Sequence, residues 1–139
     1  MTFLRGTACA VAFLALTAPA AADPPASPDL SGAWVAQEIV GDRIYQYTPP
    51  TLVFSDATHL SGETQCNSYS ARYDLYGGRG LSIRSLIRPR HGCADGVAQA
   101  RADRYFAALN AVTTMELRED GALILRTPAS GAITFRRAE

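Results

Sequence analysis

Hydrophobic and polar residues alternate most clearly between positions 68 and 75. Tyr69, Ala71, Tyr73 and Leu75 occupy every second position, and polar residues stand between them. Because successive side chains of a strand point to opposite faces, this pattern predicts a strand with one buried face. Shorter segments between turn-forming residues predict further strands at 31–40, 51–54, 81–87, 112–118, 122–127 and 132–136.

One segment, 94–110, has the periodicity of a helix instead. Asp95 stands where its side chain can cap the first turn. Gln99, Asp103 and Arg104 face away from an apolar stripe. That stripe comprises Ala98, Ala102, Tyr105, Phe106 and Leu109. The predicted fold class is therefore α+β, with a curled, mainly antiparallel β-sheet of about seven short strands, barrel-like, packed on one α-helix.

The first 22 residues have the order of a secretory signal peptide. Arg5 precedes an apolar run at 8–16, and three alanines end the segment at Ala22. The run is about half of the ~20 residues that a membrane-spanning helix needs, so we expect cleavage after Ala22 rather than a retained anchor. Residues 23–30 are rich in proline and predict a disordered lead. A single domain then occupies residues 31–137.

Cleavage would also change the charge balance. It would leave 117 residues, enough for one small domain, with 12 basic and 13 acidic side chains. A net charge of −1 gives no field that favours nucleic acid or a membrane surface. We therefore expect a periplasmic or secreted monomer with no membrane span and no nucleic-acid partner.

Two cysteines remain after cleavage, Cys66 and Cys93. In an exported protein, two cysteines favour a disulfide bond. The alternative is a metal site, because His59 and His91 stand near the two cysteines in the sequence and zinc accepts such ligands. Their spacing matches no zinc finger or ribbon, so we predict a disulfide and neither a metal nor a cofactor.

The order of these features resembles the META domain of the HslJ-like family over residues 31–137. The shared features are Leu60-Ser61-Gly62, Cys66-Asn67, an alternating strand, a glycine turn, a second strand, Cys93, one helix with Phe106 and Leu109, and a final hairpin from Gly121 to Phe135. The resemblance implies a small bacterial envelope domain associated with stress responses, with no established enzymatic activity or cofactor. Two features depart from the family: the charged, proline-containing segment 88–92, and the lack of a lipobox.

Several side chains are candidates for an interaction site. Arg84, Arg88 and Arg90 share strand parity and predict a basic stripe that can bind phosphate or carboxylate groups. The alternative, which surface charges more often fit, is an ordinary solvated face with nearby acidic residues. His91 stands beside this stripe and can titrate near neutral pH, and a surface histidine without a role is the alternative.

The other candidates stand at bends. Asn67 can present its amide to a partner, but asparagine is also common where backbone bends. Tyr45 and Tyr47 precede two prolines and can form a binding edge or cover a margin of the core.

No catalytic or nucleotide-binding motif occurs in the sequence, which lacks G-x-S-x-G, H-E-x-x-H, a P-loop and G-x-G-x-x-G. We therefore expect no enzyme, but an exported envelope protein that acts through binding. Its expected partner is an envelope protein or an anionic envelope component. The alternatives are a small-ligand carrier with a barrel cavity, or an inhibitor of an envelope hydrolase that uses loop 45–50 or 88–92.

Overall fold

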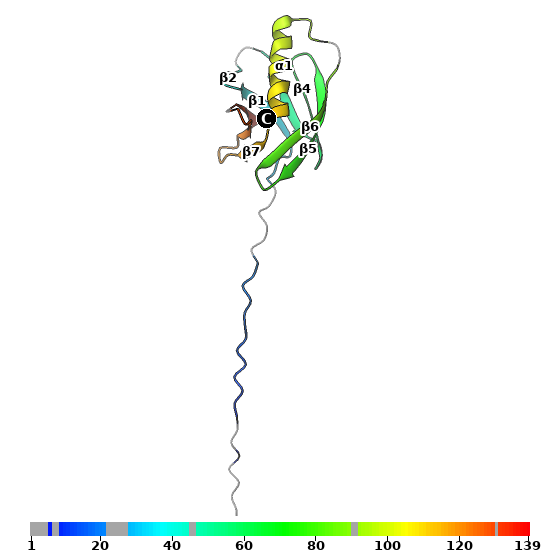
Figure 1. Ribbon diagram of the computed structural model, residues 1–139. Helices are drawn as coiled ribbons and strands as arrows, with labels where there is room; N and C mark the ends of the chain where they lie inside the picture. Colours follow the sequence, from blue (N-terminus) through cyan, green and yellow to red (C-terminus); the bar gives the residue numbers. More distant parts are fainter. Residues whose placement is uncertain (1–5, 7–8, 22–27, 45–46, 90–91, 130) are drawn as a thin grey trace, which may run out of the picture.

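The computed structural model describes residues 6, 9–21, 28–44, 47–89, 92–129 and 131–139. Its elements, in chain order, are β1 (Ala33–Ile39), β2 (Asp42–Arg43), β3 (Thr51–Phe54), β4 (His59–Glu63), β5 (Ser68–Tyr76), β6 (Gly80–Ile87), α1 (Gly96–Ala111), β7 (Thr114–Leu117), β8 (Leu123–Arg126) and β9 (Ala132–Arg137). Residues 9–21 contain no helix or strand and extend away from these elements (Figure 1).

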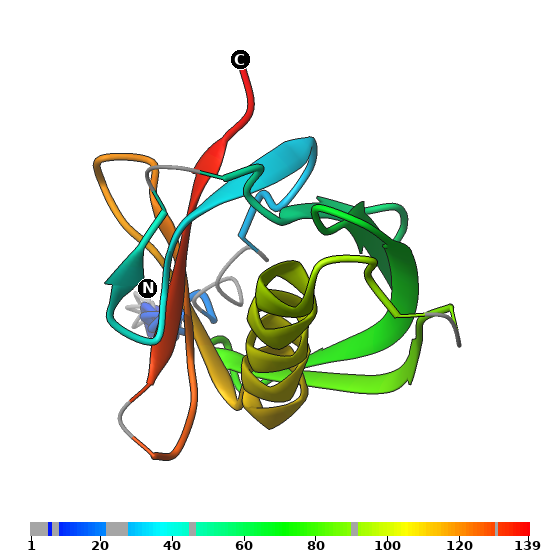
Figure 2. The ribbon, with the colours of Figure 1, turned by 90° about the horizontal axis from the view of Figure 1, so that it is seen from above.

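The strands form one antiparallel sheet that closes on itself. β1 pairs with both β3 and β9, so eight strands form a ring, and the short β2 is attached to the end of β1 (Figure 2). The weakest joint lies between β6 and β7, where one residue pair, Gly80 and Thr114, continues the ladder. Helix α1 lies against β6 beside this joint. The predicted α+β class, with a barrel-like antiparallel sheet packed on one helix, is confirmed.

The predicted number of strands is too low by two, because the described residues form nine. β2 is a two-residue strand after a tight turn, and β4 contains Ser61 and Gly62, two residue types that are common at bends and gave no strand signal. Gly62 is needed for close packing within the sheet. A Cβ atom at this position would lie 2.0 Å from the carbonyl oxygen of Thr51 and 2.6 Å from the hydroxyl of Tyr69. Glycine thus lets β3 and β5 approach β4 closely.

The core fills the centre of the ring. Its largest side chains with less than 2% exposure are Trp34, Leu52, Leu60, Leu81, Tyr105, Leu109, Leu123, Leu125, Ile133 and Phe135. Of the alternating residues in β5, Tyr69, Ala71 and Tyr73 are buried as predicted. The prediction is wrong for Leu75, which is 41% exposed because it lies beside the β5–β6 turn, at the end of the barrel wall.

Helix α1 follows its predicted stripe. Ala98, Ala102, Tyr105, Phe106 and Leu109 are all buried. Asp95 caps the helix, because its side chain accepts a hydrogen bond from the backbone N–H of Val97 at 2.9 Å. Within the described residues, no helix has the length and apolar character needed to cross a membrane.

Candidate ligand-binding site

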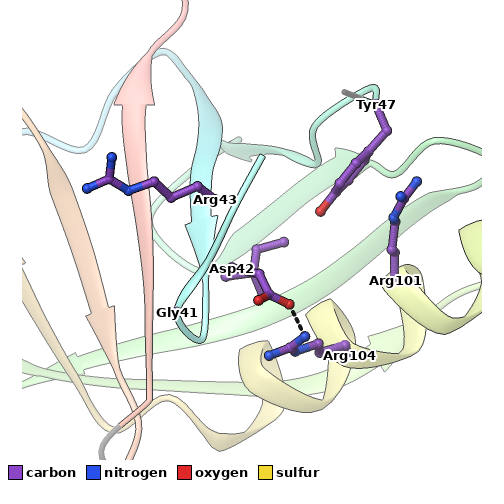
Figure 3. A pocket seen from close by; sticks show the side chains of 7 residues that line it. Gly41, Asp42, Arg43, Tyr47, Arg101 and Arg104 are labelled. Carbon is purple, nitrogen blue, oxygen red and sulfur yellow. Dashed lines mark hydrogen bonds and ion pairs between the residues drawn. The ribbon is translucent and has the colours of Figure 1, made fainter. Parts of the chain in front are cut away.

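A pocket of about 470 Å³ opens between the β1–β2 hairpin, Tyr47 and the outward face of α1 (Figure 3). It is called the arginine pocket below, and its lining residues are Ile39, Gly41, Asp42, Arg43, Tyr47, Arg101 and Arg104. Its volume falls within the range of roughly 300–1,000 Å³ that is typical of small-molecule sites. It combines a predicted candidate, Tyr47, with charged residues from two distant segments.

The β1–β2 turn forms one wall of the arginine pocket. Ile39 pairs with Asp42, so Val40 and Gly41 form a two-residue turn, and their φ angles are +48° and +85°. Such turns match the right-handed twist of paired strands but need positive φ at both positions. Glycine adopts this conformation easily, whereas a β-branched residue such as valine is strained in it. The structure therefore holds a strained residue at the rim of the pocket.

Helical spacing places two arginines on the opposite wall. Arg101 and Arg104 are three residues apart, so they share one face of α1. The neighbouring residues Ala102 and Tyr105 point into the core. The burial of one helix face thus presents the two guanidinium groups to the arginine pocket.

Arg104 is committed to the protein itself. Its Nη1 pairs with Oδ2 of Asp42, and its Nη2 donates to the carbonyl oxygen of Val40 at 3.2 Å. These contacts tie α1 to the β1–β2 turn across 62 residues of sequence. Arg104 and Asp42 therefore fix the shape of the arginine pocket.

Arg101 is held differently. Its Cζ atom lies 3.9 Å from the centroid of the Tyr47 ring, the distance of a cation–π contact. Among the residues that the structure describes, no carboxylate or carbonyl oxygen is found as a hydrogen-bond or ion-pair partner of this guanidinium. Stacking occupies a face of the guanidinium and leaves the N–H groups on its edge able to donate.

Arg43 contributes charge from the third side. Its Nε lies 3.7 Å from Oε2 of Glu38, on the neighbouring strand. In Figure 3 its side chain extends away from Tyr47 and Arg101. The lining of the arginine pocket thus carries three guanidinium groups and one carboxylate, which favours an anionic ligand.

The predicted disulfide is present between Cys66 and Cys93, with a Cα–Cα distance of 5.6 Å. It joins the β4–β5 turn to the segment before α1. Asn67 closes that turn: its carbonyl oxygen accepts from the N–H of Thr64 at 2.7 Å, and its N–H donates to Oγ1 of Thr64 at 3.2 Å. The side-chain Oδ1 of Asn67 is buried and has no hydrogen-bond partner within the described part of the chain. Asn67 lies outside the arginine pocket.

The predicted arginine stripe is not continuous. Ser85 has a φ of +56°, and the pairing of β5 with β6 shifts register there. The bulge adds one residue to β6, so the residues after it point to the face opposite to the one that simple alternation predicts. Arg84 pairs with Asp74 at 2.9 Å, while Arg88 pairs with Asp103 of α1 at 2.8 Å and lies over the ring of Phe106. The prediction of one basic face is therefore wrong for these two residues.

Arg88 also changes the pKa of Asp103, its acidic partner on α1. Its hydrogen bond, together with one from Gln99, lowers the pKa of Asp103. Arg90, His91 and Tyr45 lie outside the described residues, so their proposed roles stay predictions.

His59, the other histidine considered for a metal site, bonds to a carboxylate at the β3–β4 turn. Its Nδ1 lies 3.0 Å from both side-chain oxygens of Asp56. Asp56 also accepts from the N–H of Thr58, and these hydrogen bonds lower the pKa of Asp56 to about 2. The described residues contain no group of three or more potential metal ligands.

Sequence reasoning found Tyr47 but not the residues around it. Arg104 was predicted only as an outward-facing helix position, and neither Arg101 nor Asp42 was a candidate. Their common signal is weak: an outward i, i+3 pair of arginines on a helix is frequent on protein surfaces. What distinguishes this pair is the tertiary contact with the β1–β2 turn.

The fold defines a small helix-packed β-barrel, and the arginine pocket on its surface is lined by three guanidinium groups and one carboxylate. The chain belongs to the META domain family, whose model matches residues 28–139. A protein from Burkholderia xenovorans, solved by NMR, is similar with a TM-score of 0.61 and 26% identity, over 88% of this chain and 96% of that one. A second NMR structure, at 22% identity, shares the fold with a TM-score of 0.60, over 78% of this chain and 90% of that one. No curated protein matches the chain.

Proposed function

We propose that this META-domain protein is an exported, non-catalytic binding protein of the bacterial envelope, and that it binds anionic groups in the arginine pocket. The observation that carries the proposal is the state of Arg101. Its guanidinium is stacked on Tyr47 and has no acidic partner among the described residues, whereas the Arg104 guanidinium beside it is paired with Asp42. A positioned but unpaired guanidinium is suited to bind a ligand.

Physical chemistry supports an anion rather than a neutral ligand. A guanidinium donates two parallel N–H bonds to a carboxylate, phosphate or sulfate group. Stacking on Tyr47 restricts the long side chain before binding, which reduces the entropy that binding must overcome. A charge-assisted hydrogen bond contributes about 1.5–3 kcal/mol. The arginine pocket can therefore hold a small anion with modest affinity.

Export is supported by two features. The disulfide between Cys66 and Cys93 fits an oxidising compartment. The side chains of Phe13, Leu14 and Leu16 are almost fully exposed and add nothing to the core, as expected for a signal peptide that is removed after export. The family resemblance adds an association with envelope stress.

The two alternative functions have less support. A carrier needs an internal cavity, but Trp34, Tyr105 and Phe135 fill the centre of the barrel. A loop-based inhibitor needs exposed, uncommitted side chains, but Arg88 is bonded to Asp103 and Tyr47 is stacked on Arg101.

The proposal is tested by replacing Arg101 with glutamine. Titration of the purified protein with sodium sulfate and sodium acetate, followed by ¹⁵N NMR, should shift the signals of Arg101 and Tyr47. We expect Arg101→Gln to lower the affinity for both anions about tenfold, because one charge-assisted contact is lost.

Arg79→Gln is the matched control. Arg79 is an exposed arginine outside the arginine pocket, and its replacement changes the net charge equally. It should leave both affinities unchanged. Equal anion binding by Arg101→Gln and the native protein would show that the arginine pocket is not the anion site.

A further inference from the structure

Asp42 is an unexpected residue for an anion site. Its carboxylate lines the arginine pocket and is 63% exposed, although one oxygen pairs with Arg104. A carboxylate beside a bound anion repels it and lowers its affinity. Its position is useful, however, when the ligand also carries hydrogen-bond donors, because an ionised carboxylate is a strong acceptor.

Tyr47 adds a second polar group to the same side. Figure 3 shows its hydroxyl at the end of the ring that points towards Asp42 and Arg104. None of the hydrogen bonds found among the described residues uses this hydroxyl. From Arg101 to Asp42, the pocket wall thus presents a cationic donor, a phenol that donates or accepts, and an anionic acceptor.

The size of the pocket separates the ligand classes further. About 470 Å³ is far more than one carboxylate or sulfate group fills, and it suits a ring with several substituents. Nucleotides have less support, because Asp42 would repel a second or third phosphate charge. A ligand with one anionic group and several hydroxyl groups meets all three wall residues.

We infer that the arginine pocket binds an acidic sugar, with the carboxylate on Arg101 and ring hydroxyl groups on Asp42 and Tyr47. This inference rests on the proposed function, because it names the ligand class of the same site. The hydroxyl groups donate to Oδ1 of Asp42, the oxygen that does not pair with Arg104, and the sugar carboxylate accepts from the edge of the Arg101 guanidinium. Arg104 keeps Asp42 in position and is a positioning residue.

The test is a comparison of two ligands on one variant, Asp42→Asn. The probes are D-glucuronate, which has a carboxylate and hydroxyl groups, and acetate, which has the carboxylate alone. An asparagine amide oxygen still accepts from Arg104, so the wall keeps its shape, but the charge on the acceptor is lost. Affinities are measured by calorimetry or NMR titration with the full-length protein.

The affinities of the two probes should respond differently to Asp42→Asn. We expect the native protein to bind D-glucuronate about tenfold more tightly than acetate, by one additional charge-assisted contact. Asp42→Asn should weaken D-glucuronate binding about threefold or more, and should leave acetate binding equal or stronger because a repulsive charge is gone. Glu119→Gln, which removes a negative charge outside the arginine pocket, should change neither.

Three outcomes would overturn the inference, and they can be distinguished from failure of the proposed function. The first is that the native protein binds D-glucuronate and acetate with equal affinity, or that Asp42→Asn changes both affinities by the same factor. Either result would exclude an acidic sugar as the specific ligand and leave a general anion site. Tighter binding of glycine than of D-glucuronate would assign the Asp42 acceptor to an ammonium group and identify an amino-acid site. Unchanged binding of both probes by Arg101→Gln would overturn the proposed function itself.

Discussion

The two faces of helix α1 have opposite chemistry. The inward face places Tyr105 against Tyr69, with 2.6 Å between their hydroxyl oxygens, and both side chains are buried. Burial raises the pKa of both phenols well above the usual value, so they stay neutral. The outward face presents Arg101 and Arg104, which are charged and partly or largely exposed.

This difference separates stability from recognition on one helix. A buried neutral group must be hydrogen-bonded, so its loss affects the free energy of unfolding. An exposed guanidinium remains solvated in the folded and unfolded states, so its loss changes stability by less than about 0.5 kcal/mol. Substitutions on the inward face should therefore leave anion binding unchanged, and substitution of Arg101, which has no ion-pair partner among the described residues, should leave stability nearly unchanged.

The largest effect on stability should come from the disulfide. Replacing Cys66 and Cys93 by serine removes a crosslink across 27 residues, and the chain-entropy model predicts a loss of about 3–4 kcal/mol. Urea unfolding of the double variant and of the native protein, with and without reductant, measures the difference. The reduced native protein should match the variant, while sulfate affinity of the folded variant should stay native. A common urea midpoint for all samples would contradict this prediction.

A smaller effect on stability should come from the hydrogen-bonded pair Tyr69 and Tyr105, and it should differ between the two tyrosines. Tyr69 donates to the carbonyl oxygen of Thr51 at 2.6 Å, so Tyr105 must donate to Tyr69. Tyr69→Phe removes a hydrogen-bond donor and an acceptor at once, and it should lower the free energy of unfolding by about 2 kcal/mol. Tyr105→Phe leaves the hydrogen bond to Thr51 intact, and it should lower the free energy of unfolding by about 1 kcal/mol. Urea unfolding measures both. A greater cost for Tyr105→Phe would reverse the assigned direction of the hydrogen bonds.

The sequence was sufficient for the parts of the fold that depend on local periodicity. The helix stripe with Tyr105 and Leu109, the buried parity of Tyr69 and Tyr73, and the cap at Asp95 all follow from spacing along one element. The disulfide was predicted because two cysteines remain after the expected cleavage and because an exported protein was expected. These features need no knowledge of which strands are neighbours.

The remaining features depend on contacts between distant elements. The strand around Gly62 was not predicted, because the packing role of this glycine becomes visible only beside Thr51 and Tyr69. The bulge at Ser85 has no glycine to mark it, so the parity of Arg84 and Arg88 was misread. The arginine pocket exists because closure of the barrel brings the β1–β2 turn next to α1. The alternation of residues along a strand cannot predict this contact between distant elements.

The smallest effect should occur at the rim of the arginine pocket, and it should be a gain. Val40 has a φ of +48° in a turn where asparagine followed by glycine is preferred. Val40→Asn should therefore stabilise the protein by about 1 kcal/mol, since asparagine tolerates this conformation and Gly41 already follows. The backbone carbonyl that accepts from Arg104 is retained, so anion affinity should stay within about twofold of the native value. Thermal unfolding and sulfate titration of the same sample measure both quantities. If Val40→Asn lowers stability, the loss of the valine methyl groups, which lie near Gly131, outweighs the relief of backbone strain. If instead it lowers affinity tenfold, the strained turn itself shapes the site, and stability and recognition are coupled at this rim rather than separated by the helix.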